Sequence, residues 1–294
     1  MELKSNIFDT ALIFEGGGMR ASFTSGIVNT LLENELYFNY IAGISAGSSC
    51  TLNYLSRDKK RTKASFVDFV KDPEFGGWRT FLRGKGFFNA QYIYCESCLP
   101  GSTLPYNFEN FLNNEADFDI GAFNMDRSEL VYWSRKDVEK MEDLMLMVRA
   151  SSSLPIFMPP TKVKGEMYID GGIQCGIALD AAMNRGFEKF VIVLTREKGY
   201  IKGPPNRKRI LKRLFKSYPK TLETIMNRYI EYNKTMEYIK QLERENKAFV
   251  IYPDSMPIDN REKDIKKLEE MYQLGINQGN RQINDLKQFL GMPE

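Results

Sequence analysis

The chain contains 294 residues, of which 43% are hydrophobic and 27% are charged, and its formal net charge is +3. A chain of this length and composition can bury a sizeable core, which excludes a small disulfide-stapled fold and a largely disordered chain. The net charge is too small to indicate a nucleic acid or another polyanion as a partner. The sequence contains no histidine, and this absence limits how a serine or a cysteine can be activated.

No segment has the pattern of a secretory signal or of a membrane span. Residues 1–9 lack a long apolar core behind a basic start, and no stretch approaches the roughly 18 apolar residues that cross a bilayer. We therefore expect a cytoplasmic protein. Whether the protein also contacts a membrane surface depends on the basic segment 207–218, described below.

Two apolar segments near the N-terminus each lead into a glycine-rich turn and then a helix. The first predicted strand, at 11–14, precedes Glu15-Gly16-Gly17-Gly18-Met19-Arg20, and apolar residues at helical spacing predict a helix over about 19–36. The second predicted strand, at 40–42, precedes Gly43-Ile44-Ser45-Ala46-Gly47 and another helix. This order predicts parallel strands with both turns at the carboxyl edge of the sheet, where α/β folds bind ligands.

The rest of the predicted α/β region contains fewer diagnostic motifs. A short apolar stretch ends in a turn at Asp170-Gly171-Gly172. The other expected elements, in chain order, are an irregular segment with short helices at 57–114 that shapes the rim of a pocket, a strand pair at 118–123 and 130–133, helices at 143–150 and 180–186, and a strand at 190–195.

The composition changes at Gly199, which predicts an α/β domain at 1–198 and a mainly helical extension at 199–294. The basic segment 207–218 predicts an amphipathic helix. This helix either lies in a lipid interface or packs on the protein with its charges in solvent. The other predicted elements of the extension are a long helix at 221–245, a strand at 248–252 and a helical stretch at 261–290.

Ser45 is the candidate nucleophile. The sharp turn from strand to helix leaves no room for side chains at Gly43 and Gly47, as in a nucleophile elbow. The following helix directs its free N–H groups and its positive dipole end at the serine, which favours an anion formed there. If the Gly16–Gly18 turn lies beside Ser45, its successive N–H groups form an oxyanion hole. Arg20 either adds positive charge to that turn or braces it.

A serine in this chain needs a base other than histidine. Asp170 is the candidate because Gly171 and Gly172 let other backbone approach its turn closely. An exposed aspartate, with a pKa of about 3.9, is a weak base for a serine, and burial in an apolar environment would raise that pKa. The alternative is that Asp170 only stabilises its own turn.

Two further motifs have competing interpretations. Gly16–Ala21 satisfies the loose G-x-G-x-x-A pattern of dinucleotide binding, but the acidic residues Glu33 and Glu35 fall at the end of the helix rather than after the second strand. Cys95 and Cys98 form a C-x-x-C pair. Without a second close pair or any histidine, they indicate reduced thiols rather than a metal or redox site.

Taken together, three motifs resemble the patatin-like phospholipase family. Residues 15–20, Gly43–Gly47 and Asp170–Gly172 stand in the order of that family's motifs. The segment Ala150-Ser151-Ser152-Ser153-Leu154-Pro155 also resembles the part of the family that precedes the aspartate. The resemblance covers about 11–195, and the segment beyond it resembles the C-terminal extension of one bacterial subgroup.

The resemblance implies a three-layer α/β/α fold with a mostly parallel central sheet. It also implies lipid acyl-ester hydrolysis by a Ser-Asp dyad, with Ser45 as nucleophile, Asp170 as its base and Gly16–Gly18 as the oxyanion hole. Glu15 and Ala21 depart from the family pattern and flank the hole. Residues that are expected to support the site are Arg20, Gly43, Gly47, Gly171 and Gly172.

We therefore expect a serine hydrolase that acts on phospholipids or other lipid acyl esters and that uses neither a cofactor nor a metal ion. Two alternatives stay open: an acyltransferase with the same dyad, and a non-catalytic lipid-binding protein that keeps the pocket. Segment 207–218 is the candidate for peripheral contact with a lipid surface, with packing on the protein as the alternative, and the sequence indicates no oligomeric state.

Overall fold

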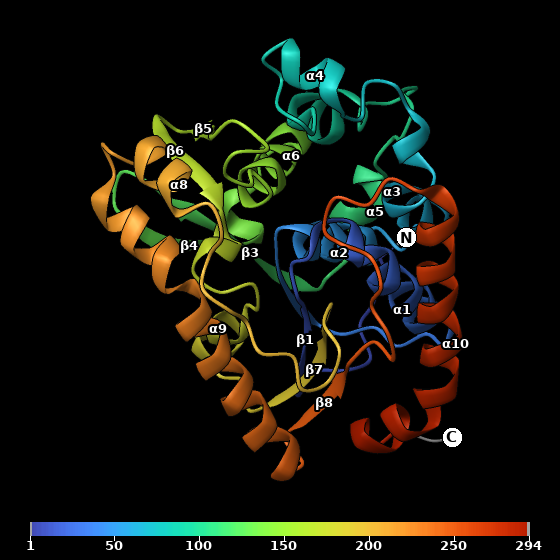
Figure 1. Ribbon diagram of the computed structural model, residues 1–294. Coiled ribbons are helices and arrows are strands. Elements are labelled where there is room, and N and C mark those ends of the chain that lie inside the picture. The colour runs from blue at the N-terminus through green and yellow to red at the C-terminus, as the bar shows by residue number, and fades with distance from the viewer. Residues whose placement is uncertain (1, 293–294) are drawn as a thin grey trace.

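The computed structural model describes residues 2–292 and contains one eight-stranded sheet with the strand order β5-β6-β3-β2-β1-β7-β8, while β4 pairs with β3 outside this path (Figure 1). The β1–β2, β2–β3, β1–β7 and β7–β8 pairs are parallel, whereas β3 is antiparallel to both β4 and β6. The strands are β1 (Thr10–Phe14), β2 (Tyr40–Ile44), β3 (Asp117–Asn124), β4 (Glu129–Trp133), β5 (Thr161–Val163), β6 (Glu166–Asp170), β7 (Lys189–Val193) and β8 (Ala248–Ile251).

Helices lie on both faces of this sheet (Figure 1). The α-helices are α1 (Ala21–Glu33), α2 (Ala46–Leu55), α3 (Lys59–Phe66), α4 (Trp78–Leu82), α5 (Phe108–Asn113), α6 (Met141–Ser151), α7 (Leu179–Asn184), α8 (Lys208–Leu214), α9 (Pro219–Arg244) and α10 (Ile265–Leu290). Single turns of 3-10 helix are η1 (Gly18–Arg20), η2 (Phe69–Lys71), η4 (Arg135–Asp137) and η5 (Gly171–Ile173), and η3 (Tyr92–Glu96) is a π-helical turn.

The core is divided between the two faces of the sheet because successive side chains of a strand point in opposite directions. In β1, Leu12 and Phe14 pack with the apolar faces of α1, α2 and α10. Ala11 and Ile13 point the other way and pack with α7 and α9. The expectation of a three-layer α/β/α fold with a mostly parallel sheet and a mainly helical extension is therefore confirmed.

Residues after Gly199 are built into the main sheet rather than standing apart from it. β8 pairs with β7 from Phe190↔Ala248 to Val193↔Ile251. The helix α9 covers one face of the sheet, and α10 packs on α1 over the other (Figure 1). A division of the chain between residues 198 and 199 remains a proposal. No helix within residues 2–292 combines the length and the apolar character that a membrane crossing requires.

The contact between α1 and α10 depends on glycine in both helices. A Cβ at Gly26 would meet the carbonyl oxygen of Tyr272, and a Cβ at Gly275 would meet the carbonyl oxygen of Phe23. Because the clashing atoms belong to the backbone, neither contact can be relieved by turning a side chain. The extension is therefore docked by close approach of two helix backbones.

We expect Gly275→Ala to destabilise the protein although alanine normally favours a helix interior by about 1 kcal/mol relative to glycine. The methyl group overpacks the α1–α10 contact, and such changes cost about 1–3 kcal/mol. Urea unfolding measures the difference in the free energy of unfolding. Asn280→Ala, at an exposed position of α10, is the matched control. A stabilised Gly275→Ala protein would contradict the packing that we describe.

The β5–β6 hairpin has no counterpart among the elements predicted from the sequence. Lys162, Lys164 and Glu166 lie in or beside these short strands, and their charges obscure the alternation that marks a strand. Lys164 and Gly165 have φ angles of 47° and 94°, as the two central residues of a type I′ hairpin turn require. The Lys-Gly pair is the signal that could have revealed the hairpin.

Candidate active site

Ser45 lies between β2 and α2 with φ 58° and ψ −127°, a backbone conformation that residues other than glycine rarely adopt. A Cβ at Gly43 would meet the carbonyl oxygen of Gly47, and a Cβ at Gly47 would meet the carbonyl oxygen of Phe14. The steric reason for glycine on both sides of the serine is therefore present in the structure. The turn has the geometry of a nucleophile elbow.

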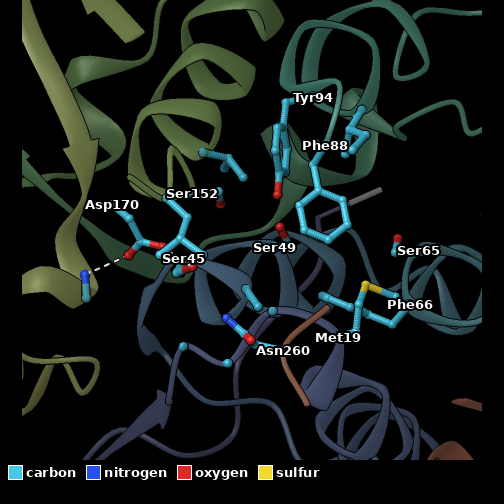
Figure 2. Close-up of a pocket in the computed structure, with 18 of the residues that line it drawn as sticks. Met19, Ser45, Ser49, Ser65, Phe66, Phe88, Tyr94, Ser152, Asp170 and Asn260 are labelled. Carbon is cyan, nitrogen blue, oxygen red and sulfur yellow. Dashed lines mark hydrogen bonds between the residues drawn. The ribbon is translucent and has the colours of Figure 1, made fainter. Parts of the chain in front are cut away.

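The carboxylate of Asp170, at the end of β6, accepts two hydrogen bonds. The Ser45 hydroxyl donates to Oδ2 at 2.6 Å, and the Gly172 amide donates to Oδ1 at 2.7 Å (Figure 2). Asp170 is only 4% exposed, and burial raises its pKa although the two hydrogen bonds and the charge of Arg228 act in the opposite direction. The raised pKa makes this carboxylate a stronger base than an exposed aspartate.

The pairing register of β3 explains how these two residues, 125 positions apart, come together. Ile44 at the end of β2 pairs with Gly121, and Asp170 at the end of β6 pairs with the next residue of β3, Ala122. β4 pairs with β3 across both positions, and a strand has only two edges for hydrogen bonding. β2 and β6 therefore share the other edge of β3 and meet end to end, which places Ser45 against Asp170.

The end of α6 and the residues after it fill the junction between β2 and β6. The Ser151 hydroxyl accepts a hydrogen bond from the Ser45 amide at 2.8 Å and donates to the carbonyl oxygen of Gly121 at 2.6 Å. The Ser153 carbonyl oxygen accepts from the Asp170 amide at 3.0 Å. Ser151 thus links the elbow to β3. The sequence marks 150–155 only by its likeness to the family and carries no local signal for this positioning contact.

The Gly16–Gly18 turn lies directly against the elbow. A Cβ at Gly16 would stand 3.1 Å from the Ser45 Cβ, so this approach needs glycine. The amide of Gly16 donates to the carbonyl oxygen of Gly176 at 2.9 Å and is already engaged. The amides of Gly17 and Gly18 find no acceptor among the residues that the structure describes. The turn therefore offers two free amides beside Ser45 rather than the three predicted from the sequence.

Glu15 connects the glycine turn to the helical extension. Its Oε2 accepts from the amide of Thr195 at 2.6 Å and from its hydroxyl at 3.0 Å, and its Oε1 accepts from the Tyr232 hydroxyl at 3.0 Å. Arg20 braces the same turn through an Nε bond of 3.2 Å to the Thr195 carbonyl oxygen. Burial and the charge of Arg196 lower the pKa of Arg20 to about 10, so it remains positive at neutral pH.

A cavity of about 220 Å³ begins at Ser45 and Asp170. Figure 2 shows Asp170 on one side of Ser45, and Phe88 and Phe66 on the other. Much of the apolar wall comes from the segment at 57–114, whose residues line the cavity. The apolar wall includes Phe66, Phe69, Phe75, Phe88, Leu104 and Met145. Such a cavity suits a ligand with an apolar chain and a polar end.

The remaining candidate motifs add no second reactive centre to the described part of the chain. Cys95 and Cys98 are free thiols, and burial raises the pKa of Cys95 above its usual value. No group of three His, Cys, Asp or Glu side chains within residues 2–292 is arranged to hold a metal ion.

These features define a hydrolase-like α/β fold with a serine elbow, and comparison with known proteins shows its class. A family model described as Patatin-like phospholipase matches residues 12–183, which is more than half of the chain, and the chain belongs to this family. A domain of unknown function, DUF6363, matches residues 218–291.

Two particular proteins are similar to this chain along most of its length. The uncharacterized protein YjjU of Escherichia coli (strain K12) is 22% identical over 275 residues, which cover 90% of this chain and 74% of that protein. The crystal structure of VipD from Legionella pneumophila matches with a TM-score of 0.50 and 13% identity over 94% of this chain and 67% of that one. The second likeness concerns the fold alone.

Proposed function

We propose that this protein is a serine acyl hydrolase that cleaves lipid acyl esters, with Ser45 as the nucleophile and Asp170 as its general base. The observation that carries the proposal is the 2.6 Å hydrogen bond from the Ser45 hydroxyl to Asp170 Oδ2, in a chain without histidine. Membership of the patatin-like phospholipase family supports a lipid ester as the substrate class.

In the first half of the reaction, Ser45 Oγ attacks the ester carbonyl carbon while Asp170 Oδ2 takes the hydroxyl proton. The carbonyl oxygen becomes an oxyanion, and the free amides of Gly17 and Gly18 are the proposed donors to it. The tetrahedral intermediate collapses by breaking the bond to the alcohol oxygen, which receives the proton from Asp170. An acyl-Ser45 ester remains, and the alcohol leaves.

In the second half, Asp170 takes a proton from a water molecule that attacks the acyl-Ser45 carbonyl carbon. Collapse of this second intermediate breaks the bond to Ser45 Oγ, which recovers its proton from Asp170 and releases the fatty acid. The Gly172 amide holds Asp170 Oδ1 throughout, so that Oδ2 stays directed at the serine. If an alcohol replaces water in this half, the same residues transfer the acyl group instead.

Labelling with a fluorophosphonate tests the proposal directly, since the reagent forms a covalent adduct with an activated serine. We expect peptide mapping to place the adduct on Ser45. Incubation with a mixed lipid extract, followed by mass spectrometry of the products, should show free fatty acids, whereas new esters after addition of an alcohol would identify an acyltransferase. A folded protein that carries no adduct on Ser45 would contradict the proposal.

We expect kcat/KM for a neutral, soluble ester to rise with pH through the pKa of Asp170. The base acts as a carboxylate, so activity is lost when pH falls through that pKa. Because burial raises it, the acidic limb should lie above the range of an exposed aspartate. A profile between about pH 4 and 8 measures it. A limb at or below the usual aspartate range would show that the carboxylate is not desolvated during catalysis.

Contact between 207–218 and a lipid surface also remains a proposal. Leu211 and Phe215 of this segment are buried against α9 and the sheet, in a cluster with Ile225, so part of its apolar face packs within the protein. Ile210 and Leu214 are 46% and 54% exposed beside the cations of α8. These two side chains are the ones that could enter an interface.

A further inference from the structure

Of the five cationic side chains that line the cavity, four lie close enough to one another to interact electrostatically: Arg20, Arg196, Lys202 and Arg228. Among residues 2–292, no carboxylate oxygen lies within 4.0 Å of a cationic nitrogen of any of them. The Nε atoms of Arg196 and Arg228 are buried and have no hydrogen-bond partner in the described structure. Arg20 is buried, and Arg196, Lys202 and Arg228 are half-buried. Cations withdrawn from water are normally paired, so the cluster lacks the close counter-ions that such a position calls for.

The two carboxylates at the site offset only part of the charge of these four cations. Glu15 acts electrostatically on Arg20 and Lys202, and Arg228 acts on Asp170. Neither carboxylate forms an ion pair with the cluster, and their oxygens are held by neutral donors: Thr195 and Tyr232 on Glu15, and Ser45 and Gly172 on Asp170. The unfavourable environment of the cations is reflected in the pKa of Lys202. Burial, and next the charge of Arg228, lower the pKa of Lys202 to about 7.

The extension positions these cations firmly. The backbone of Lys202 is clamped by Asn233 of α9, which accepts from its amide at 2.9 Å and donates to its carbonyl oxygen at 3.0 Å. The Lys202 ammonium lies 4.2 Å from the centre of the Tyr232 ring, and the Arg196 guanidinium lies 4.4 Å from that of Tyr200. Such contacts order the side chains without neutralising their charge.

The cluster reaches the side of Ser45 on which the alcohol of an ester would leave. Arg228 Nη2 stands 3.5 Å from the position of a Cβ on Gly172, and its charge acts on Asp170. Asp170, as the acid that protonates the departing alcohol, lies next to that alcohol. The apolar residues Phe66 and Phe88 lie on the opposite side of Ser45 (Figure 2) and are suited to the acyl chain.

We propose that Arg196, Lys202 and Arg228 bind a phosphate on the alcohol part of the substrate, so that the enzyme prefers acyl esters whose alcohol ends in a phosphomonoester. The inference rests on the proposed hydrolase function. Guanidinium groups match the oxygens of a phosphate with paired N–H donors, and a lysine adds a point charge. A dianion is favoured over a zwitterionic headgroup because a quaternary ammonium would be repelled by the same cations.

This assignment gives the C-terminal extension a role in the site. Arg228 belongs to the segment that matches the domain of unknown function, at 218–291, whereas Arg196 and Lys202 lie between the two matched regions. The Tyr232–Glu15 hydrogen bond ties α9 to the glycine turn. Substrate selection would thus be supplied by α9 and by the loop that leads to it.

The test is a binding measurement on the Ser45→Ala protein, which prevents turnover. Calorimetry compares 1-acylglycerol 3-phosphate with the neutral 1-acylglycerol of the same chain length. We expect the phosphate ester to bind more tightly, and we expect Arg228→Gln to reduce this preference by about 10- to 100-fold, as for the loss of hydrogen bonds to a charged group. Lys220→Gln, which removes an exposed cation from the same helix, should leave the preference unchanged.

Equal affinities for the two lipids, or a preference that survives both Arg228→Gln and Lys202→Gln, would overturn the proposal. Lys202→Gln decides the matter if Arg228→Gln does not fold, since it removes a charge that burial already disfavours. Inorganic phosphate alone should compete weakly with the phosphate ester. Phosphate that binds without competing would show a separate effector site and would overturn the substrate assignment.

The two proposals fail in different ways. If the wild-type protein hydrolyses both lipids with equal kcat/KM and the Ser45→Ala protein binds them equally, the hydrolase function stands and the phosphate subsite falls. If neither lipid is hydrolysed but the Arg228-dependent binding preference persists, the subsite stands as a lipid-binding site and the hydrolase function falls.

Discussion

Ser45→Ala is expected to lower kcat/KM for lipid ester hydrolysis by about 10⁵-fold or more, as for removal of a catalytic serine in other hydrolases. Alanine cannot form the acyl ester, so the reaction loses its covalent route. The substitution also removes a hydrogen bond that lowers the pKa of Asp170, and that pKa should rise further. At the same pH, a smaller fraction of Asp170 would then be the carboxylate that could activate water for direct attack on the ester.

Release of fatty acid from a lipid ester measures this effect, and thermal unfolding checks that the fold is kept. The Ser45→Ala protein should still bind lipid, because the cavity walls remain. If its activity stays within about tenfold of the parent protein, Ser45 is not the nucleophile.

Asp170→Asn is expected to lower kcat/KM by about 10³- to 10⁴-fold. Asparagine keeps the shape of the side chain but cannot accept the Ser45 proton, and its NH₂ group would face either the Ser45 hydroxyl or the Gly172 amide. The fold should be kept, since the change removes a carboxylate that burial disfavours. Fluorophosphonate labelling of Ser45 should slow together with ester hydrolysis.

Asp119→Asn provides the matched control for this substitution. Asp119, on β3, is also a buried carboxylate, but it does not line the cavity and it accepts hydrogen bonds from Tyr40 of β2 and from Arg185 after α7. Its loss should reduce the free energy of unfolding by about 1–3 kcal/mol with little change in kcat/KM of the folded protein. If both variants lose activity in proportion to stability, Asp170 has a structural role alone.

The elbow illustrates what local sequence can establish. Glycine at positions 43 and 47 predicts a tight turn around Ser45, because the reason is steric and lies within a few residues. The same holds for β1, β2 and β7, which consist almost entirely of apolar residues. The predicted helix over about 19–36 instead begins with the 3-10 turn η1 and ends at Glu33, and α10 begins at Ile265 rather than near 261, since helix ends depend on contacts outside the helix.

The glycine turn illustrates where local reasoning stops. Three successive glycines predicted three amide donors, yet the carbonyl oxygen of Gly176 takes one of them. The sequence gives no indication that residue 176 lies beside residue 16. Similarly, Glu15 is recognised from the sequence only as a departure from the family pattern, whereas the fold shows that it reaches Tyr232 in α9.

By itself, the sequence determined the elbow around Ser45 from local sterics and the need for a base other than histidine from the residue inventory. The order of its predicted elements, together with the family resemblance, indicated the class of fold. Only the tertiary structure decided that Asp170 is buried within hydrogen-bond reach of Ser45, because that contact depends on the register of β2 and β6 along one edge of β3. It alone also brought Arg196, Lys202 and Arg228 to one cavity. The sequence contains no pattern that shows which distant charges will lie close together. Their distances are set by the packing of the extension against the sheet.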